Sequence, residues 1–303
     1  HNMKDAIPKF YETFIPTLEV LSSGEAIHYI ELKKRVRDKY YSDLPDDLLA
    51  QKTKTGDILI LNRIGWAKTY LKDAGFLVQP KRAMVQITSK GQERLKTAEL
   101  TLKQLKNDPQ YIECQNNKAK NKSESESATE EQKFESSTPQ DLIDQGFSAI
   151  EKNSKLELLQ KLKEIDPYYF EKVILILLKK MGYGEFVETK KSNDGGIDGV
   201  INQDQLGLEK IYMQAKRYSD NKVREKDIRN FIGAMSGDTT KGVFVTTSSF
   251  DQAAIQKANE AHHKIILIDG VKLTDLMYQF GVGVQIRETY EVKEVDEDFF
   301  ENT

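Results

Sequence analysis

The chain has 303 residues, of which 38% are hydrophobic and 31% charged, and its net charge is -3 at pH 7. This length is enough for two ordinary domains, each with its own core. No run of about 18 apolar residues is present, which excludes a membrane-spanning helix. The small net charge gives no overall attraction for nucleic acid, so any such contact requires basic residues gathered on particular faces.

Cysteine and histidine are too scarce for a zinc site. Cys114 is the only cysteine, which excludes an intramolecular disulfide, and histidine occurs only four times. Any metal site must therefore be built from carboxylates, and this favours Mg²⁺, Mn²⁺ or Ca²⁺. The first residues, His1 and Asn2 before Met3, match neither a signal peptide nor a transit peptide. We expect a cytoplasmic protein without a membrane partner.

The first part of the chain, residues 1–103, has the element order of a winged helix-turn-helix. Helical patterns and then strand patterns follow one another at residues 7–21, 26–39, 63–74, 76–79 and 83–88. The basic turn at residues 80–82 joins the two strands. Three helices followed by a basic two-stranded hairpin are typical of this DNA-reading fold.

We predict that this domain binds double-stranded DNA through its third helix and its hairpin tip. A helix in the major groove must present base-reading and phosphate-reading side chains together. The candidates are Asn62, Arg63 and Lys68 on the helix and Lys81 and Arg82 on the tip. The alternatives are that these basic residues form a solvated face, or that the domain is a protein-interaction module.

Residues 104–139 are predicted as a flexible polar linker. The stretch 116–137 is almost free of aliphatic residues and is rich in Lys, Glu, Ser and Asn. Burial cannot offset the ordering entropy of such a segment. We expect it to separate the first domain from a second domain at residues 140–303.

The second domain is predicted as a mixed α/β sheet with helices on both faces. It opens with helical sequence at 140–164, and Asp166 and Pro167 are a good N-cap and first residue for a helix at 167–181. Strands and helices follow, with strands at 185–189, 199–202, 210–215, 242–246 and 264–268 and helices at 226–235, 250–261 and 271–278.

Two short motifs of this domain suit phosphodiester hydrolysis. The segment 193–199 (NDGGIDG) holds Asp194 and Asp198 before a strand, and Gln214 and Lys216 follow on another strand. Residues two apart on a strand face the same side, and Asp198 joins Gln214 and Lys216 if it begins the adjacent strand. A carboxylate and an amide oxygen can hold a divalent cation against a phosphate, and a lysine can stabilise developing negative charge.

The same residues have structural explanations. Asp194 fits an ordinary turn, and a strand lysine is usually exposed. However, Tyr212 and Ala215 alternate against the two polar residues of their strand, in a run expected inside the sheet, where polar side chains need a reason. We therefore favour an active site containing Asp198, with Arg217 and its basic neighbours contacting phosphates.

The motifs also resemble a known family. Residues 140–285 resemble the Mrr restriction-endonuclease catalytic domain, a branch of the PD-(D/E)xK nuclease superfamily, in the strings DGGIDG, QAKR and GVFVTTSSF. Residues 5–100 look like the winged-helix domain that precedes it in Mrr proteins. The resemblance implies a restriction-endonuclease-like α/β/α fold and a type IV enzyme that cuts methylated DNA with Mg²⁺, for which Mn²⁺ is a possible substitute.

The resemblance also implies roles for individual residues. Asp198 is the metal-binding aspartate, Gln214 takes the ligand position usually held by Glu, Lys216 is the catalytic lysine, and Glu171 is the acidic residue and metal ligand on the opening helix. A double-strand cut further implies a homodimer or higher homo-oligomer. A non-catalytic DNA-binding regulator and a junction or repair nuclease of the same fold remain as alternatives.

Overall fold

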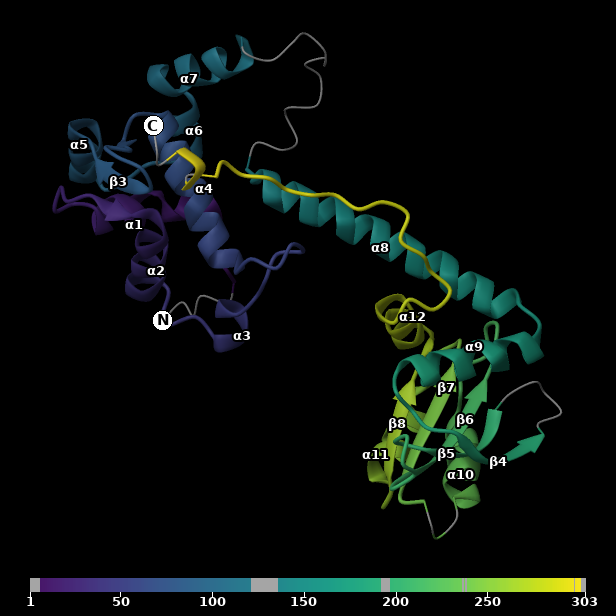
Figure 1. Ribbon diagram of the computed structural model, residues 1–303. Helices are drawn as coiled ribbons and strands as arrows, with labels where there is room; N and C mark the ends of the chain where they lie inside the picture. The colour runs from purple at the N-terminus through teal and green to yellow at the C-terminus, as the bar shows by residue number, and fades with distance from the viewer. Residues whose placement is uncertain are drawn as a thin grey trace. The chain divides into compact units, whose positions relative to one another are not determined.

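The computed structural model describes residues 6–120, 136–191, 197–235, 237, 239–296 and 298–300 (Figure 1). The contacts divide the chain into two compact units. The first comprises His1–Ser148 with Val292–Thr303, and the second comprises Ala149–Glu291. Within the described ranges, every helix is too short or too polar to cross a lipid bilayer.

The first unit has the predicted order of helices followed by a hairpin. Its elements up to the hairpin are η1 (Phe10–Thr13), α1 (Phe14–Val20), β1 (Ile27–His28), α2 (Tyr29–Tyr40), α3 (Asp46–Leu49), α4 (Leu59–Asp73), β2 (Leu77–Val78) and β3 (Met84–Ile87). The three strands form an antiparallel sheet in the order β1-β3-β2. The large side chains at its centre are fully buried, among them Phe10, Phe14, Leu32, Ile64, Leu71 and Phe76.

Two boundaries in this unit differ from the sequence prediction. Residues 27–28, expected inside a helix, form β1, because Ile27 pairs with Val85 of the distant strand β3. Helix α4 begins at Leu59, four residues before the predicted start. Both differences come from tertiary contacts that override local pattern, since Leu59 and Ile60 are buried in the core.

The predicted linker is partly helical. Helices α5 (Ser89–Thr97), α6 (Leu102–Lys106) and α7 (Pro109–Lys120) follow the hairpin. Tyr111 of α7 stacks on Tyr70 of α4 with ring centroids 5.9 Å apart, and Lys118 lies 2.6 Å from Asp73. Residues 104–120 therefore pack on the first unit instead of forming a tether. Residues 121–135 lie outside the described part of the chain.

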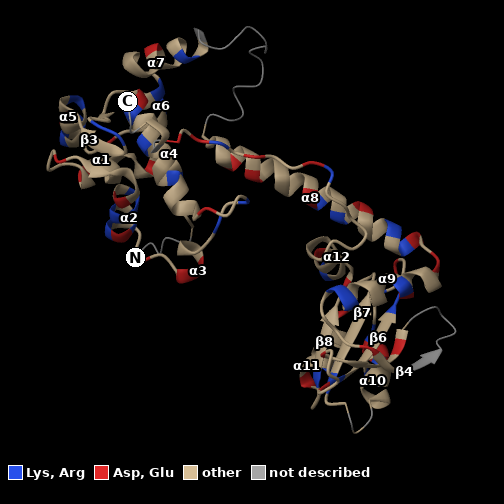
Figure 2. Cartoon of the chain, in the orientation of Figure 1, with Lys and Arg blue, Asp and Glu red and all other residues tan. Residues whose placement is uncertain are grey.

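The C-terminal residues also differ from the predicted division. They are predicted to belong to the second domain, whereas the segment from Val292 groups with the first unit. Glu294 of this segment acts electrostatically on Lys33 of α2, a residue of the first unit. Burial lowers the pKa of Lys33, and the negative charges of Asp57 and Glu294 oppose this lowering. Basic and acidic residues are interspersed along α2 and α8 (Figure 2).

The second unit contains a five-stranded mixed sheet. Its elements are α8 (Pro139–Glu164, which begins in the first unit), α9 (Pro167–Lys180), β4 (Phe186–Lys191), β5 (Ile197–Asn202), β6 (Lys210–Lys216), α10 (Glu225–Ala234), β7 (Lys241–Thr246), α11 (Gln252–Glu260), β8 (Lys264–Ile268) and α12 (Gly270–Gln279). The strand order is β4-β5-β6-β7-β8. The pairs β4/β5 and β5/β6 are antiparallel, and β6/β7 and β7/β8 are parallel.

Helices cover both faces of this sheet, which confirms the predicted α/β/α architecture. On one face, odd-numbered residues of β5 and β6, such as Met213 and Ala215, pack with α9 and α12. On the other face, Tyr212 of β6 and Phe244 of β7 pack with Phe231 of α10 and with α11. The two apolar clusters are separate, so each face of the sheet has its own core.

Local sequence signals set the ends of the elements that position the site. The Asp166 side chain accepts hydrogen bonds from the backbone N–H groups of Tyr168 and Tyr169, and Pro167 is the first residue of α9. Gly182, with φ of 93°, takes the left-handed conformation after that helix. At Gly242 a Cβ would lie 2.8 Å from the Phe231 ring, so glycine lets α10 approach β7 closely.

Candidate active site

The pairing of β5 with β6 places Asp198 directly opposite Gln214. Opposite residues of an antiparallel pair point to the same face, with Cβ atoms about 4.5–5.5 Å apart. Lys216 is two residues beyond Gln214 and therefore shares this face, where it pairs in register with Thr246 of β7. The structure thus brings the three predicted residues to one face of the sheet.

This polar set lies at the boundary between the core and solvent. Asp198, Gln214 and Lys216 are all half-buried, whereas Tyr212 and Phe244 on the same face are almost completely covered. Charges in such a partly desolvated position interact more strongly than at an open surface. The arrangement suits a site that must hold an ion and a phosphate group together.

Tyr212 belongs to this face, which corrects one expectation from the sequence. From the sequence, Tyr212 and Ala215 are expected on the side opposite Gln214 and Lys216. However, positions 212, 214 and 216 are two apart and point to the same side. Of Tyr212 and Ala215, only Ala215 points into the apolar core on the opposite face of the sheet. The Tyr212 hydroxyl donates a hydrogen bond to Oδ1 of Asp198. Burial, followed by this bond and the charge of Asp198, raises the pKa of Tyr212.

The chain beyond Lys216 is fixed to the end of β7. The Tyr218 N–H donates to Oγ1 of Thr247 at 2.9 Å, and the same hydroxyl donates to the Tyr218 carbonyl at 2.6 Å. Thr247 is buried, and the carbonyl of Ser248 accepts a bond from the Gly270 N–H at 2.8 Å. These bonds restrain the strand end that carries Lys216.

Arg217 is directed away from the polar set. It follows Lys216 on the strand, and its Nη1 donates to the backbone carbonyl of Lys163 at the end of α8. Its Nε is buried and has no hydrogen-bond partner among the described residues. In this conformation the guanidinium of Arg217 is bonded to the Lys163 carbonyl and does not point toward the polar set. Its predicted phosphate contact therefore stays a prediction.

Glu171 lies on α9, the helix that packs against the opposite face of the sheet. It is half-buried beside Phe170. Within the described ranges, no hydrogen bond or ion pair joins it to Asp198 or Lys216. Its assignment as a metal ligand therefore stays a prediction from the resemblance.

The donor set fits a hard divalent cation. Among the described residues, no three His, Cys, Asp or Glu side chains gather in a way that would enclose a metal. Asp198 and Gln214 instead offer one carboxylate and one amide oxygen at paired positions. Mg²⁺ commonly binds through one or two protein oxygens and completes its shell with water and substrate phosphate. Asp194 lies outside the described residues.

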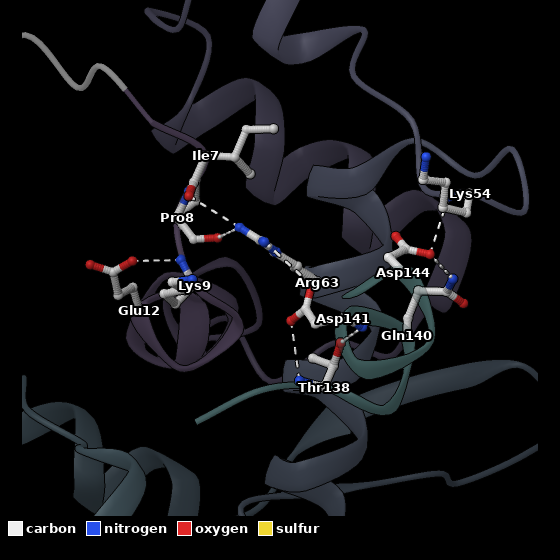
Figure 3. A network of polar contacts seen from close by, with 10 residues as sticks. All are labelled: Ile7, Pro8, Lys9, Glu12, Lys54, Arg63, Thr138, Gln140, Asp141 and Asp144. Atoms are coloured by element: carbon white, nitrogen blue, oxygen red, sulfur yellow. Dashed lines mark hydrogen bonds and ion pairs between the residues drawn. The ribbon is translucent and has the colours of Figure 1, made fainter. Parts of the chain in front are cut away.

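In the first unit, Arg63 has structural contacts (Figure 3). Its Nη1 donates to the carbonyls of Ile7 and Pro8 at 3.2 and 3.0 Å, and its Nη2 lies 3.3 Å from the carboxylate of Asp141 on α8. The side chains of Arg63 and Asp141 are each only 12% exposed. A DNA contact by Arg63 would require these bonds to break.

The other predicted DNA-binding residues differ in availability. Asn62 is half-buried on α4, and its Oδ1 has no hydrogen-bond partner in the described part of the chain. The Lys68 ammonium lies 4.8 Å from the centre of the Tyr29 ring. Lys81 is exposed and Arg82 half-buried at the hairpin tip, so the tip is the most accessible part of the predicted surface.

Comparison with known proteins matches both units. A restriction endonuclease family model, Mrr_cat, matches residues 162–277, and the Mrr N-terminal domain model matches residues 10–97. The type IV methyl-directed restriction enzyme EcoKMrr of Escherichia coli (strain K12) is 32% identical over 269 residues. That similarity covers 85% of this chain and 88% of the relative.

Two solved structures are similar in part. The DNA modification-dependent restriction endonuclease AspBHI is 21% identical, with a TM-score of 0.36, over 54% of this chain and 41% of that chain. The MspJI restriction endonuclease in complex with a 27-mer oligonucleotide is 14% identical, with a TM-score of 0.29, over 66% and 48%. Less than half of either solved chain is covered, and these similarities carry no argument about activity. The identity to EcoKMrr along most of both sequences and the match of both domain models show that the chain belongs to the Mrr family of restriction endonucleases.

Proposed function

We propose that this protein is a type IV restriction endonuclease that hydrolyses phosphodiester bonds in methylated DNA at the site formed by Asp198, Gln214 and Lys216. The observation that carries the proposal is the register of β5 and β6, which sets Asp198 opposite Gln214 with Lys216 on the same face. A restriction endonuclease needs such a meeting of oxygen ligands and a cation to act on a phosphodiester.

The chemistry divides among these side chains. Restriction endonucleases generally use a divalent ion, which, when bound here, would polarise the scissile phosphate and lower the pKa of a bound water. Asp198 and Gln214 would hold Mg²⁺ or its substitute Mn²⁺ through their oxygens. The Lys216 ammonium stabilises the negative charge that develops on the phosphate oxygens, or positions the attacking water. Glu171 is proposed as a further ligand.

The choice of methylated DNA rests on the relative. EcoKMrr is named a methyl-directed enzyme, and its similarity extends through the N-terminal unit. In this chain the hairpin of that unit borders an open hollow of 690 Å³ whose lining includes three basic residues, Lys72, Lys81 and Arg82. Such a basic surface suits the phosphate backbone of double-stranded DNA.

Asp198→Ala tests the assignment. The full chain is incubated with methylated and unmethylated plasmid, with Mg²⁺, with Mn²⁺ and with EDTA, and DNA binding is measured in parallel. We expect the wild type to cut only methylated plasmid and only with metal. Asp198→Ala should lose cleavage by at least about 100-fold and keep most of its DNA affinity, because the N-terminal unit is unchanged.

The control is Asp220→Ala, which removes an exposed carboxylate for which no contact is found in the described residues. This variant should cut like the wild type. Full cleavage by Asp198→Ala would contradict the site. DNA binding without cleavage of any substrate by the wild type would favour a regulator, and preference for branched over methylated linear DNA would favour a junction nuclease.

A further inference from the structure

The hydroxyl of Tyr212 forms a hydrogen bond with one carboxylate oxygen of Asp198 at the proposed metal site. It donates to Oδ1 of Asp198, which lies diagonally across the β5–β6 pair. An ionised carboxylate has two oxygens and about four acceptor positions. With Oδ1 engaged, Oδ2 of Asp198 remains as the oxygen without a partner among the described residues.

The ring that carries this hydroxyl is firmly held. Tyr212 is 4% exposed, and its ring centroid lies 5.0 Å from that of Phe231 on α10. Phe231 in turn packs against Phe244 at 5.4 Å and fits against Gly242 on β7. Packing of the ring in the apolar core therefore fixes the position and direction of the Tyr212 hydroxyl.

The hydrogen bond also has a fixed sense. An ionised carboxylate is an acceptor only, so the hydroxyl must donate. A phenol hydroxyl makes this bond as an uncharged donor. A neutral donor fixes the rotation of Asp198 and adds no positive charge to compete with a metal ion.

We propose that Tyr212 is a positioning residue for metal binding: its hydroxyl holds Asp198 so that Oδ2 and the Gln214 side chain face the same point. This inference rests on the proposed function, because it assumes that Asp198 is the metal ligand. Partners that orient the ligands of a metal ion are worth about 10- to 100-fold in metal affinity or activity when removed. Tyr212 acts through Asp198, without contacting the substrate.

The test uses Tyr212→Phe in the full chain, which keeps the ring and its contact with Phe231 and removes only the hydroxyl. Two quantities are measured: the Mg²⁺ concentration that gives half-maximal cleavage of methylated plasmid, and Mn²⁺ binding followed by electron paramagnetic resonance of the free ion. We expect both to shift to weaker binding by roughly tenfold. At saturating Mg²⁺ most of the cleavage rate should return.

Tyr183→Phe is the matched control. Tyr183 is half-buried in the other apolar cluster of the same unit, so its hydroxyl is expected to have no influence on either metal measurement. If Tyr212 served stability alone, Tyr212→Phe would lower the melting temperature and leave both metal measurements at their wild-type values. That result would overturn the proposal.

Asp198→Ala separates this inference from the proposed function. If Asp198→Ala still cleaves and binds Mn²⁺ normally, the proposed site itself is wrong. If Asp198→Ala loses both properties while Tyr212→Phe matches the wild type, only the role of Tyr212 is wrong.

Discussion

At the proposed site, Gln214 is the residue that would decide how strongly metal binding depends on a single carboxylate. In the superfamily that the motifs resemble, this position usually holds Glu, whereas here it holds Gln214, which lies opposite Asp198 in the strand pair. An amide can ligate Mg²⁺ but brings no charge, so at the proposed site the attraction for the ion would fall mainly on Asp198. Gln in place of Glu at this position also avoids the repulsion that two carboxylates at paired strand positions would experience without metal.

Gln214→Glu should therefore raise the affinity for the metal ion and lower the thermal stability of the metal-free protein. We expect the Mg²⁺ concentration for half-maximal cleavage to fall on the order of tenfold, because a second ionised oxygen ligand joins the set. The melting temperature in EDTA should fall, and the rise in melting temperature on adding Mg²⁺ should be larger than in the wild type.

The control for this change is Gln205→Glu, in the exposed turn between β5 and β6. It alters the net charge by the same amount and should leave the Mg²⁺ dependence unchanged. An unaltered Mg²⁺ requirement in Gln214→Glu would show that residue 214 is not a ligand, even if Asp198 is.

The shared sheet face of the candidate residues could be predicted because the relevant rule is local. Strand periodicity of two is enough to place Gln214 and Lys216 on one side, and it also places Tyr212 there once the count is made correctly. The bond from Tyr212 to Asp198 requires, in addition, the register between two strands. The contacts of Arg63 with Pro8 and Asp141 join residues 55 and 78 positions apart, and no local pattern encodes them.

At the scale of elements, the sequence predicts best where a cap or a periodic pattern is strong. The N-cap at Asp166 sets the start of α9, and the apolar run of β8 (KIILI) gives its bounds, Lys264–Ile268, as predicted. The two-residue strand β1 was missed because it exists only through pairing with β3. Helix α7 was missed because its polar sequence is held by contacts such as Tyr111 on Tyr70.

Arg63 and Lys81 are both predicted from the sequence as DNA contacts, but their surroundings differ. We expect Arg63 to stabilise the packing of helices and Lys81 to contact DNA. Arg63 joins α4 to the chain before η1 and to the first turn of α8. Breaking a largely buried ion pair by removing one partner costs about 3 kcal/mol or more. Arg63→Ala should therefore lower the free energy of unfolding of the first unit, measured by denaturant titration.

Lys81→Ala should instead leave stability unchanged and weaken DNA binding, because Lys81 is exposed at the hairpin tip. Loss of one phosphate contact should lower the slope of log affinity against log salt concentration by about 1. A stable Arg63→Ala protein with greatly reduced DNA affinity would contradict this division and support a direct DNA contact by Arg63.

At the scale of the whole molecule, the number of sites limits what one chain can cut. The described part of the chain contains one set of Asp198, Gln214 and Lys216. The two strands of DNA are antiparallel, so a single site in one orientation acts on one strand. A symmetric dimer supplies a second site related by a two-fold axis, which matches the symmetry of the duplex backbone.

We therefore predict that a double-strand break requires two intact chains. Wild-type chains and Asp198→Ala chains with different tags are produced together, and mixed assemblies are isolated through both tags. On methylated supercoiled plasmid, the wild-type assembly should produce linear DNA, whereas the mixed assembly should stop at nicked circles because only one strand meets an active site. Linear product from the mixed assembly at the wild-type rate would mean that one site cuts both strands in succession, and the dimer would then be unnecessary for the break.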